Sequence, residues 1–267
     1  MKPRHAPRAS SSRLKGGRAR APYSDRLGAE PDQVWLWGTH AVKAALGNPH
    51  RQVIEVLATR NAARELPEGA KAKVVEPDEI DARLPQGAVH QGVAARCAPL
   101  EPVALEALIA PAEGVLVLLD QVTDPQNVGA VLRSAAAFEA RGMILQDRKA
   151  PPFSGGCAKA AVGAAEQVPH ARVVNLARTL EAARAAGWRA IGLAGEATTT
   201  LETALEAAGP AVILALGAED KGLRPSVREA CDVVARIPIA RGVESLNVSN
   251  AAALALYSAR RRLGGMP

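Results

Sequence analysis

Three short polar segments carry the residues of this sequence that are suited to catalysis or ligand binding. The first holds Asn127 and Arg133, the second Gly217 and Glu219, and the third the run Ser245-Leu246-Asn247. Amide, carboxylate, hydroxyl and guanidinium groups can orient a substrate by hydrogen bonds and stabilise charge that develops during a reaction. The second segment matches neither the Gly-x-Gly-x-x-Gly pattern of dinucleotide sites nor the Gly-Lys-Ser/Thr pattern of nucleotide triphosphatases.

Each segment also has a purely structural interpretation. Asn127 could cap the helix that follows it, and Arg133 could extend from an apolar helix face into water. The segment at Gly217 is typical of a glycine turn. Ser245 could cap the last helix, with Asn247 accepting a hydrogen bond from another first-turn amide. Taken one at a time, the segments leave both interpretations open.

The elements around these segments predict where they lie. From residue 114 onward, apolar runs alternate with helical stretches, and the clearest helix spans Asn175–Ala186, with Leu176, Leu180 and Ala183 on one face. The runs read VLVLLD, GMILQ, RVV, WRAIGLA, AVILALG and VVARIPI. This alternation predicts an α/β fold with a mostly parallel sheet flanked by helices. Ligands of such sheets bind beyond the carboxyl ends of the strands, which is where the polar segments lie.

A smaller α/β domain is predicted over residues 34–98. Its strands are expected at VWLWG, VIEVLA, KVVE and AVHQGVAARC, with Thr39 as the cap of a helix over His40–Leu46. We interpret His90, at the turn-like start of the last strand, as a structural histidine. Residues 99–113 contain three prolines and predict a linker, and residues 114–267 form the second domain.

Residues 1–33 are predicted to be a disordered basic tail. Residues 1–26 hold eight Lys/Arg and one acid, so the net charge of +6 is concentrated there. The tail could keep the protein soluble, or bind RNA phosphates by counterion release. A mitochondrial transit peptide has a similar composition, but Pro3 and Pro7 disfavour the amphipathic helix that it needs.

The remaining composition argues against several classes of protein. The three cysteines are far apart and form no metal-binding spacing, so we expect no disulfide framework, no metal site and a cytoplasmic location. No apolar run approaches the roughly 20 residues that cross a bilayer, so we expect no membrane association.

Taken in order, the three polar segments resemble the signature motifs of the SpoU (TrmH-like) RNA ribose 2′-O-methyltransferases. The matching residues are Asn127…Arg133, Gly217-x-Glu219 and Ile237-Pro238…Ser245-Leu246-Asn247. Upstream, GTHAVKAAL (38–46), GAVHQGVAAR (87–96) and KAAVGAAEQVP (159–169) resemble the bacterial branch that methylates a guanosine in large-subunit ribosomal RNA. The resemblance covers about residues 34–263.

The resemblance implies a carboxyl-terminal trefoil knot, an amino-terminal domain that binds RNA, and a homodimer packed through the knotted domain. It also implies that Gly217, Ile237 and Leu246 line a pocket for S-adenosylmethionine (AdoMet). The implied catalytic set is Asn127, Arg133, Glu219, Ser245 and Asn247.

Arg133 is the residue that the resemblance nominates to activate the ribose hydroxyl. An arginine has a pKa above about 12 and rarely gives up its proton, so binding a phosphate or stabilising an oxyanion is the alternative role. The sequence leaves both roles open.

The expected reaction is methyl transfer from AdoMet to the ribose 2′-hydroxyl of a guanosine in 23S ribosomal RNA. Two alternatives are the same reaction on transfer RNA and a non-catalytic RNA-binding protein with the same knot. All five polar residues of the motifs are present, which argues against loss of catalysis. The sequence does not determine which nucleotide is modified.

Overall fold

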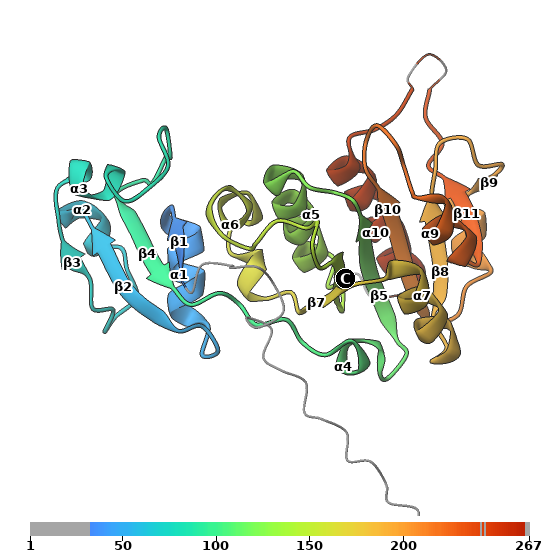
Figure 1. Cartoon of the computed structure of the whole chain (residues 1–267), viewed down its shortest axis with the longest axis horizontal. Coiled ribbons are helices and arrows are strands. Elements are labelled where there is room, and N and C mark those ends of the chain that lie inside the picture. Colours follow the sequence, from blue (N-terminus) through green and yellow to red (C-terminus); the bar gives the residue numbers. More distant parts are fainter. Residues whose placement is uncertain (1–32, 241, 243, 265–267) are drawn as a thin grey trace, which may run out of the picture.

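A computed structural model of the chain describes residues 33–240, 242 and 244–264. Two α/β domains lie side by side along the long axis of the molecule (Figure 1). The smaller, amino-terminal domain is built on a four-stranded sheet and the larger one on a seven-stranded sheet. Residues 1–32 of the predicted basic tail lie outside the described residues.

The smaller sheet has the strand order β1-β4-β2-β3. Its strands are β1 (Val34–Trp37), β2 (Val53–Ala58), β3 (Lys73–Val74) and β4 (Val93–Cys97), and its helices are α1 (Thr39–Gly47), α2 (Arg60–Ala63) and α3 (Pro77–Asp81). The four predicted strands are confirmed, although the fourth begins only at Val93. The residues before it form a loop in which Gln91 has a φ of 53° and Gly92 a φ of 77°, which a strand cannot continue through.

The prediction that Thr39 caps the first helix is wrong. The helix begins at Thr39 and its N-cap is Gly38, which has a φ of 89° and no side chain to accept a hydrogen bond. Instead, the Gln91 side chain reaches from the β4 loop and accepts a hydrogen bond from the Thr39 amide at 3.2 Å. A contact between residues distant in sequence therefore satisfies an amide that a local cap usually satisfies.

His90 is a structural histidine, as the sequence predicts. Its Nδ1 accepts a hydrogen bond from the Gly92 amide at 3.1 Å, and its Nε2 lies 3.3 Å from a carboxylate oxygen of Asp81. Both ring nitrogens are thus used to hold the loop before β4 against α3.

The larger sheet has the strand order β7-β6-β5-β10-β8-β11-β9, and every pairing in it is parallel. Its strands are β5 (Gly114–Asp120), β6 (Gly142–Gln146), β7 (His170–Val173), β8 (Arg189–Leu193), β9 (Thr199–Thr200), β10 (Ala211–Gly217) and β11 (Val233–Arg236). All of them except the two-residue β9 are predicted by the apolar runs. The mostly parallel sheet is confirmed, and the knot stays a prediction.

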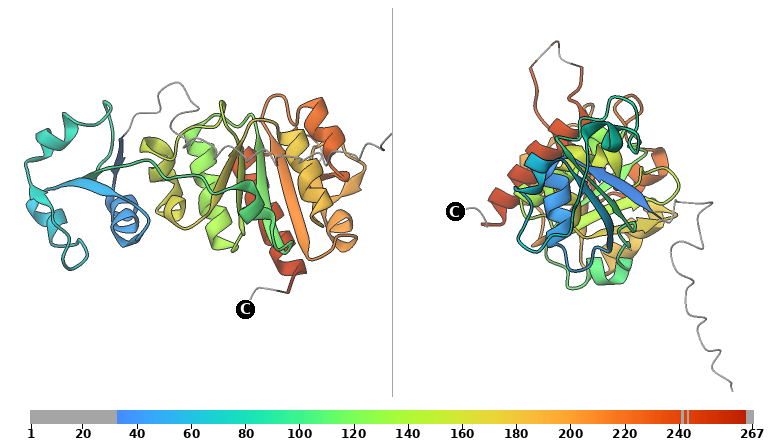
Figure 2. Two further views of the ribbon diagram at one scale, coloured as in Figure 1. Left: turned by 60° about the horizontal axis from the view of Figure 1, so that its bottom comes forward. Right: turned by 90° about the vertical axis from the view of Figure 1, so that its left-hand side faces the viewer.

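Helices cover both faces of this sheet (Figures 1 and 2). Helices α5 (Pro125–Ala137), α6 (Gly155–Ala161), α8 (Leu201–Glu206) and α10 (Val248–Arg262) contribute to the core on one face. Helices α4 (Leu105–Ile109), α7 (Leu176–Ala185) and α9 (Pro225–Ala230) contribute to the core on the other. The central strand β5 serves both cores, because its alternate side chains point to opposite faces.

The predicted linker packs against the larger domain. Its helix α4 buries Leu108 and Ile109 under the sheet. The carbonyl of Leu108 accepts a hydrogen bond from Arg141, and that of Ile109 accepts one from the indole N–H of Trp188, both at 2.7 Å. These contacts fix the α4 part of the connector to the larger domain.

The smaller domain packs against α6 and against the short 3₁₀ helix η2 (Ala164–Glu166) of the larger domain. Here Arg51 and Glu166 form an ion pair at 3.0 Å, with side chains only 1% and 4% exposed. Asn48 donates a further hydrogen bond to Glu166 at 2.8 Å. A buried carboxylate is tolerated only when it is paired in this way, so the contact constrains how the domains dock.

The loop before α6 is braced by an arginine of β7. Arg172 donates hydrogen bonds to the backbone carbonyls of Asp147, Ala150 and Pro151. In the same loop, the ring of Phe153 lies 4.4 Å from the ring of His170. Burial, assisted by the charge of Arg172, lowers the pKa of His170 from 6.5 to about 3.

The described residues contain no helix long and apolar enough to cross a membrane. In the same ranges, no group of three or more His, Cys, Asp or Glu side chains is arranged to hold a metal ion.

We predict that His170 makes the fold sensitive to acid. Below pH 6.5 the unfolded chain binds a proton on this residue while the native state does not, until the pH falls to about 3. The free energy of unfolding should therefore fall with decreasing pH in this window, by up to about 1.4 kcal/mol per pH unit from this group. Urea unfolding of the wild type and of His170→Leu at several pH values measures the difference. The exposed His50→Leu is the control and should keep the wild-type slope, whereas equal slopes for all three proteins would contradict the prediction.

Candidate active site

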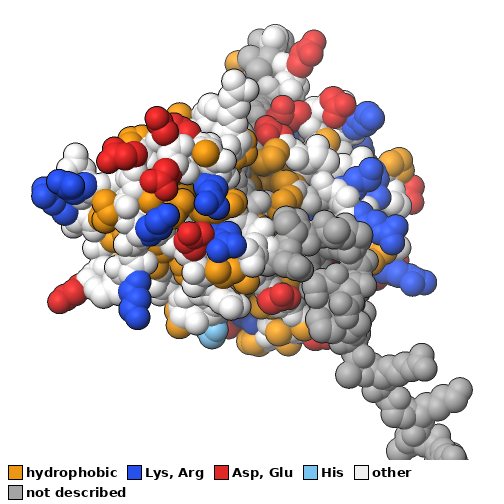
Figure 3. All heavy atoms as spheres, turned by 60° about the vertical axis from the view of Figure 1, so that its left-hand side comes forward, with side chains coloured by type: hydrophobic (Ala, Val, Ile, Leu, Met, Phe, Trp, Pro, Cys, Tyr) orange, Lys and Arg blue, Asp and Glu red, His pale blue; other side chains and the backbone are white. Residues whose placement is uncertain are grey.

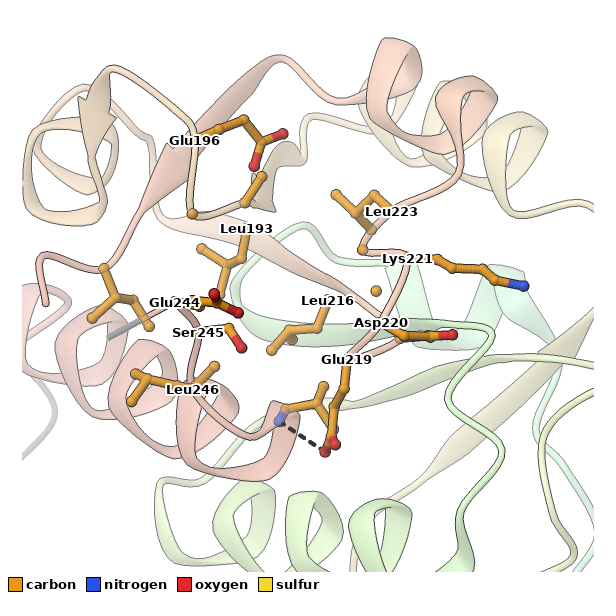
Figure 4. Close-up of a pocket in the computed structure, with 18 of the residues that line it drawn as sticks. Leu193, Glu196, Leu216, Glu219, Asp220, Lys221, Leu223, Glu244, Ser245 and Leu246 are labelled. Carbon is orange, nitrogen blue, oxygen red and sulfur yellow. Dashed lines mark hydrogen bonds between the residues drawn. The ribbon is translucent and has the colours of Figure 1, made fainter. Parts of the chain in front are cut away.

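The main cavity lies at the carboxyl edge of the parallel sheet. It has a volume of about 510 Å³ and is lined by the segments after β8, β10 and β11 and by the start of α10 (Figure 4). This is the edge where the sequence predicts that ligands of a parallel sheet bind. Five of the predicted site residues line it: Gly217, Glu219, Ile237, Ser245 and Leu246.

One wall of the cavity is made of backbone, because β10 ends in a glycine. A Cβ added at Gly217 would lie 2.0–2.2 Å from backbone atoms of Gly222 and Leu223, so no other residue fits. The loop turns back through Gly222, which has a φ of 62° and donates a hydrogen bond from its amide to the carbonyl of Ala218 at 2.8 Å. The tight loop exposes peptide groups to a ligand.

The remaining walls combine aliphatic and acidic side chains. Figure 4 shows Leu216, Leu246 and Ser245 around the cavity, with Glu219 at its edge. Glu196 lines the far side and pairs with Arg228, and hydrogen bonds from its own backbone amide and from Arg228 lower its pKa. Four acidic residues and two basic ones line the cavity: Glu196, Glu219, Asp220, Glu244, Lys221 and Arg228. The excess of carboxylates suits a ligand that carries both an apolar group and a positive charge.

Three predicted polar residues meet at the mouth of the cavity. Asn127 donates a hydrogen bond to Glu219 at 2.8 Å, and Asn247 donates to the same carboxylate oxygen. Asn247 also donates to the side-chain oxygen of Asn127 at 3.0 Å. The backbone amide of Val248 lies 3.4 Å from this oxygen of Glu219, the contact drawn as a dashed line in Figure 4. We call Asn127, Glu219 and Asn247 the polar triad.

The caps of the two neighbouring helices differ from the structural interpretation of the sequence. Asp124, rather than Asn127, caps α5 by accepting a hydrogen bond from the Gln126 amide. Asn247, rather than Ser245, caps α10, and its side-chain oxygen accepts hydrogen bonds from the backbone amides of Ser249 and Asn250. Acceptance from a first-turn amide is the part of the structural interpretation that agrees with the structure. Asn127 and Ser245 are therefore free of capping roles, and Asn247 uses its oxygen for the cap and its amide nitrogen for the triad.

Arg133 is not part of the triad. It lies on α5, and its side chain is exposed. The opposite face of the same helix is buried and carries Val128, Val131, Leu132 and Ala135. None of the hydrogen bonds of the triad involves Arg133. In a single chain, its guanidinium remains available to solvent or to an incoming anion.

Sequence reasoning missed the ion pair that holds the cavity loop. Asp120 is fully buried at the end of β5 and accepts two hydrogen bonds from Arg224, one from the backbone amide at 2.8 Å and one from Nε at 2.7 Å. The contact anchors the loop that follows β10 to the neighbouring strand. The available signal was the acid that ends an otherwise apolar strand, because a buried carboxylate requires a partner.

We predict that Asp120→Ala destabilises the protein by about 2–4 kcal/mol, because it removes both hydrogen bonds and leaves the partly buried Arg224 without its carboxylate partner. Urea unfolding measures the loss. The control is Lys73→Ala, which removes an ion pair with Glu79 whose side chains are 63% and 58% exposed. That pair should contribute less than about 1 kcal/mol. A loss in Asp120→Ala no larger than in the control would show that the loop does not depend on this anchor.

Comparison with known proteins assigns the two domains separately. The sequence profile of the SpoU rRNA Methylase family matches residues 114–257. The profile for RNA 2′-O ribose methyltransferase substrate binding matches residues 35–103.

Similar proteins match nearly the whole described chain. The 23S rRNA (guanosine-2′-O-)-methyltransferase RlmB of a Burkholderia species is 41% identical over 85% of this chain and 96% of its own length. The protein of the same name from Pseudomonas aeruginosa is 38% identical over the same shares.

Solved structures of methyltransferases also match most of the chain. The SpoU methyltransferase AviRb of Streptomyces viridochromogenes in complex with AdoMet has a TM-score of 0.73 and 25% identity, over 91% of this chain and 97% of that one. An AdoMet-bound rRNA methyltransferase from Sinorhizobium meliloti has a TM-score of 0.72 and 27% identity, over 87% and 88%. On the family profile and on relatives of about 40% identity over most of its length, the chain belongs to the SpoU rRNA methylase family.

Proposed function

We propose that this protein transfers a methyl group from AdoMet to the ribose 2′-hydroxyl of a guanosine in 23S ribosomal RNA. The observation that carries the proposal is the polar triad at the mouth of a glycine-walled cavity. The relatives that match nearly full length support the choice of substrate, since they are named for guanosine methylation in 23S rRNA. These names favour ribosomal over transfer RNA, and the intact triad favours an enzyme over a binding protein that has lost activity.

The cavity fits AdoMet. Backbone groups beside Gly217 can hydrogen-bond an adenine, while the aliphatic side chains of Ile237 and Leu246 can pack on its faces. The acids Glu219 and Glu244, which also line the cavity, complement a sulfonium charge. AdoMet supplies a methyl group activated by positively charged sulfur. We therefore assign Gly217, Ile237 and Leu246 to cofactor binding.

The chain's own residues orient the acceptor. Glu219 is held by two amide donors, so its position is set before a substrate arrives, and its second carboxylate oxygen is open to a ribose hydroxyl. Ser245 lies in the cavity wall, where its hydroxyl can donate a hydrogen bond to a bound ligand or accept one from it. Arg133 binds the phosphate of the target nucleotide or stabilises the developing alkoxide, because it is exposed and permanently charged.

The smaller domain is proposed to bind RNA through shape and individual contacts. Residues 34–98 contain eight Lys/Arg and seven Asp/Glu. Figure 3 shows basic and acidic side chains interspersed on the face that looks toward the viewer. RNA recognition by shape and by specific loops suits such a surface better than a uniform electrostatic attraction does.

The proposed organisation is an RNA-binding domain over residues 34–98, a connector over 99–113 and a methyltransferase domain over 114–267. The three cysteines are unpaired, which suits the reducing cytoplasm where ribosomal RNA is modified.

The proposed function predicts that the purified protein, given labelled AdoMet and unmodified 23S rRNA, forms one 2′-O-methylated guanosine, which primer extension locates.

The proposed role of Arg133 is tested by substitution. Arg133→Ala should reduce the rate of single-turnover methyl transfer on the order of 100-fold or more, while AdoMet affinity in calorimetry stays near that of the wild type. Arg133→Lys should restore little, because a point charge does not reproduce the planar guanidinium. The control is Arg178→Ala, an exposed arginine on α7 across the sheet. Methylation of transfer RNA alone would refute the substrate, and wild-type transfer by Arg133→Ala would refute the role of that residue.

The protein is also proposed to form a homodimer through α10. This helix buries one face under the sheet and presents Leu254 and Tyr257 to solvent, 46% and 41% exposed. A helix that is apolar on its solvent side as well as on its buried side requires a partner to cover the solvent side.

Light scattering of the wild type at micromolar concentration should therefore give twice the monomer mass of 27.7 kDa. Leu254→Glu should shift the mass to that of the monomer without unfolding the chain, since it places a charge in the proposed contact. Val174→Glu, at a residue that is 77% exposed between β7 and α7, should stay dimeric. A monomeric wild type would exclude this interface.

A further inference from the structure

A second cavity lies between the two domains, beside the start of α5. It has a volume of about 440 Å³. Trp37 and Pro85 of the smaller domain line one side, and the larger domain contributes Asp124, Gln126 and the loop residues Pro151 and Pro152. Pockets of this size at domain boundaries commonly bind ligands. None of the residues that line this cavity has been given a role in methyl transfer above.

The walls of this cavity are held in place from both domains. Arg172 fixes the loop that carries the two prolines through its bond to the Pro151 carbonyl. Trp37 packs so closely on Gly155 that a Cβ there would lie 2.8 Å from the indole ring. The buried pair of Arg51 and Glu166 keeps the domains docked. A pocket whose walls are braced in this way is formed before a ligand arrives.

The chemistry of the lining excludes some ligands and favours others. Prolines and an indole offer flat apolar surfaces, which are suited to stacking on a planar ring. The only charged residue among those that line this cavity is Asp124, so phosphates and carboxylates are disfavoured there. A neutral planar group with N–H donors on one edge fits best.

Asp124 has the free acceptor capacity that such a group needs. Its Oδ1 caps α5 through the Gln126 amide at 3.0 Å. An ionised carboxylate has about four acceptor positions, so the cap leaves Oδ2 available to the cavity. Guanine presents two adjacent donors, the ring N1–H and the 2-amino group, and adenine presents no such pair. The side-chain amide of Gln126, a residue that also lines the cavity, can donate to the guanine carbonyl oxygen.

The cavity is also placed correctly relative to the proposed catalytic centre. Asp124 and Gln126 precede Asn127 in the first turn of α5, and Asn127 belongs to the polar triad. One helical turn rises about 5 Å, so the two sites are neighbours on the scale of a single nucleotide. A nucleotide whose ribose lies at the triad can therefore place its base between the domains.

We propose that this interdomain cavity binds the guanine base of the target nucleotide, with the Asp124 carboxylate accepting hydrogen bonds from the N1–H and 2-amino edge. The inference rests on the proposed function and adds the residue that selects the base. Enzymes that modify nucleotides commonly read an unstacked base by its Watson–Crick edge in this way.

Asp124→Asn is the test, because asparagine keeps the cap oxygen but replaces the second acceptor with an N–H₂ donor. The full chain is assayed with two synthetic RNAs that carry the mapped target as guanosine or as inosine, which lacks the 2-amino group. We expect the wild type to prefer guanosine on the order of 10-fold or more in kcat/KM, as for a hydrogen bond to a charged group. In Asp124→Asn the ratio should fall to near 1, through loss of activity on guanosine, with AdoMet affinity unchanged.

The matched control is Asn175→Asp, which exchanges the same two side chains at the N-cap of α7, away from the cavity. It should keep the wild-type ratio, and thermal unfolding checks that both variants fold. Anisotropy of the same two RNAs measures the guanosine preference in binding, independently of methyl transfer. Absence of product from every RNA would refute the proposed function. A wild type that binds and methylates both RNAs equally, or an Asp124→Asn variant that keeps the preference, would overturn the guanine pocket.

Discussion

The hydrogen bonds that Asn127 and Asn247 donate to Glu219 join three parts of the chain that the sequence separates widely. Asn127 lies in the first turn of the helix after β5, Glu219 follows β10, and Asn247 precedes the last helix. One carboxylate thus accepts from two amides while Asn247 also caps α10. The rest of the larger domain, including the parallel sheet and its two layers of helices, brings these three ends to one place.

The sheet achieves this because all its pairings are parallel. In a parallel sheet the carboxyl ends share an edge, and the loops that leave them converge. Two close contacts then fix the loop after β10. Gly217 permits the backbone to fold onto Gly222, and Arg224 binds the buried carboxylate of Asp120 on the neighbouring strand. Backbone groups therefore form one wall of the main cavity, which explains why glycine and aliphatic residues line it.

The relation between the domains rests on a different kind of contact. Arg51 and Glu166 are buried together, and removing either partner would leave an uncompensated charge away from water. Such a pair contributes more to a defined geometry than to net stability. Here it holds the smaller domain against α6, so that Trp37 and the α5 amino terminus face one cavity.

The sequence by itself determined the order of the elements and the edge of the sheet where the site lies. Apolar runs of strand length are visible without a structure, because burial on both faces demands them, and the polar residues that follow are equally visible. Local contacts, however, were not predictable. Thr39 was expected to cap α1, but Gln91 satisfies its amide from 52 residues away. For Ser245 the sequence left a capping role and a site role open, and the structure excludes the cap, because Asn247 caps α10.

Only the tertiary structure decided which polar residues meet. Asn127, Glu219 and Asn247 form one hydrogen-bonded group, while Arg133, only six positions after Asn127, faces solvent on the same helix. The pairing of Asp120 with Arg224 and the cavity beside Asp124 likewise arise from segments far apart in the chain. Sequence patterns report the periodicity of burial along one segment, whereas these contacts depend on how separate segments are turned toward one another when the sheet and the two domains pack.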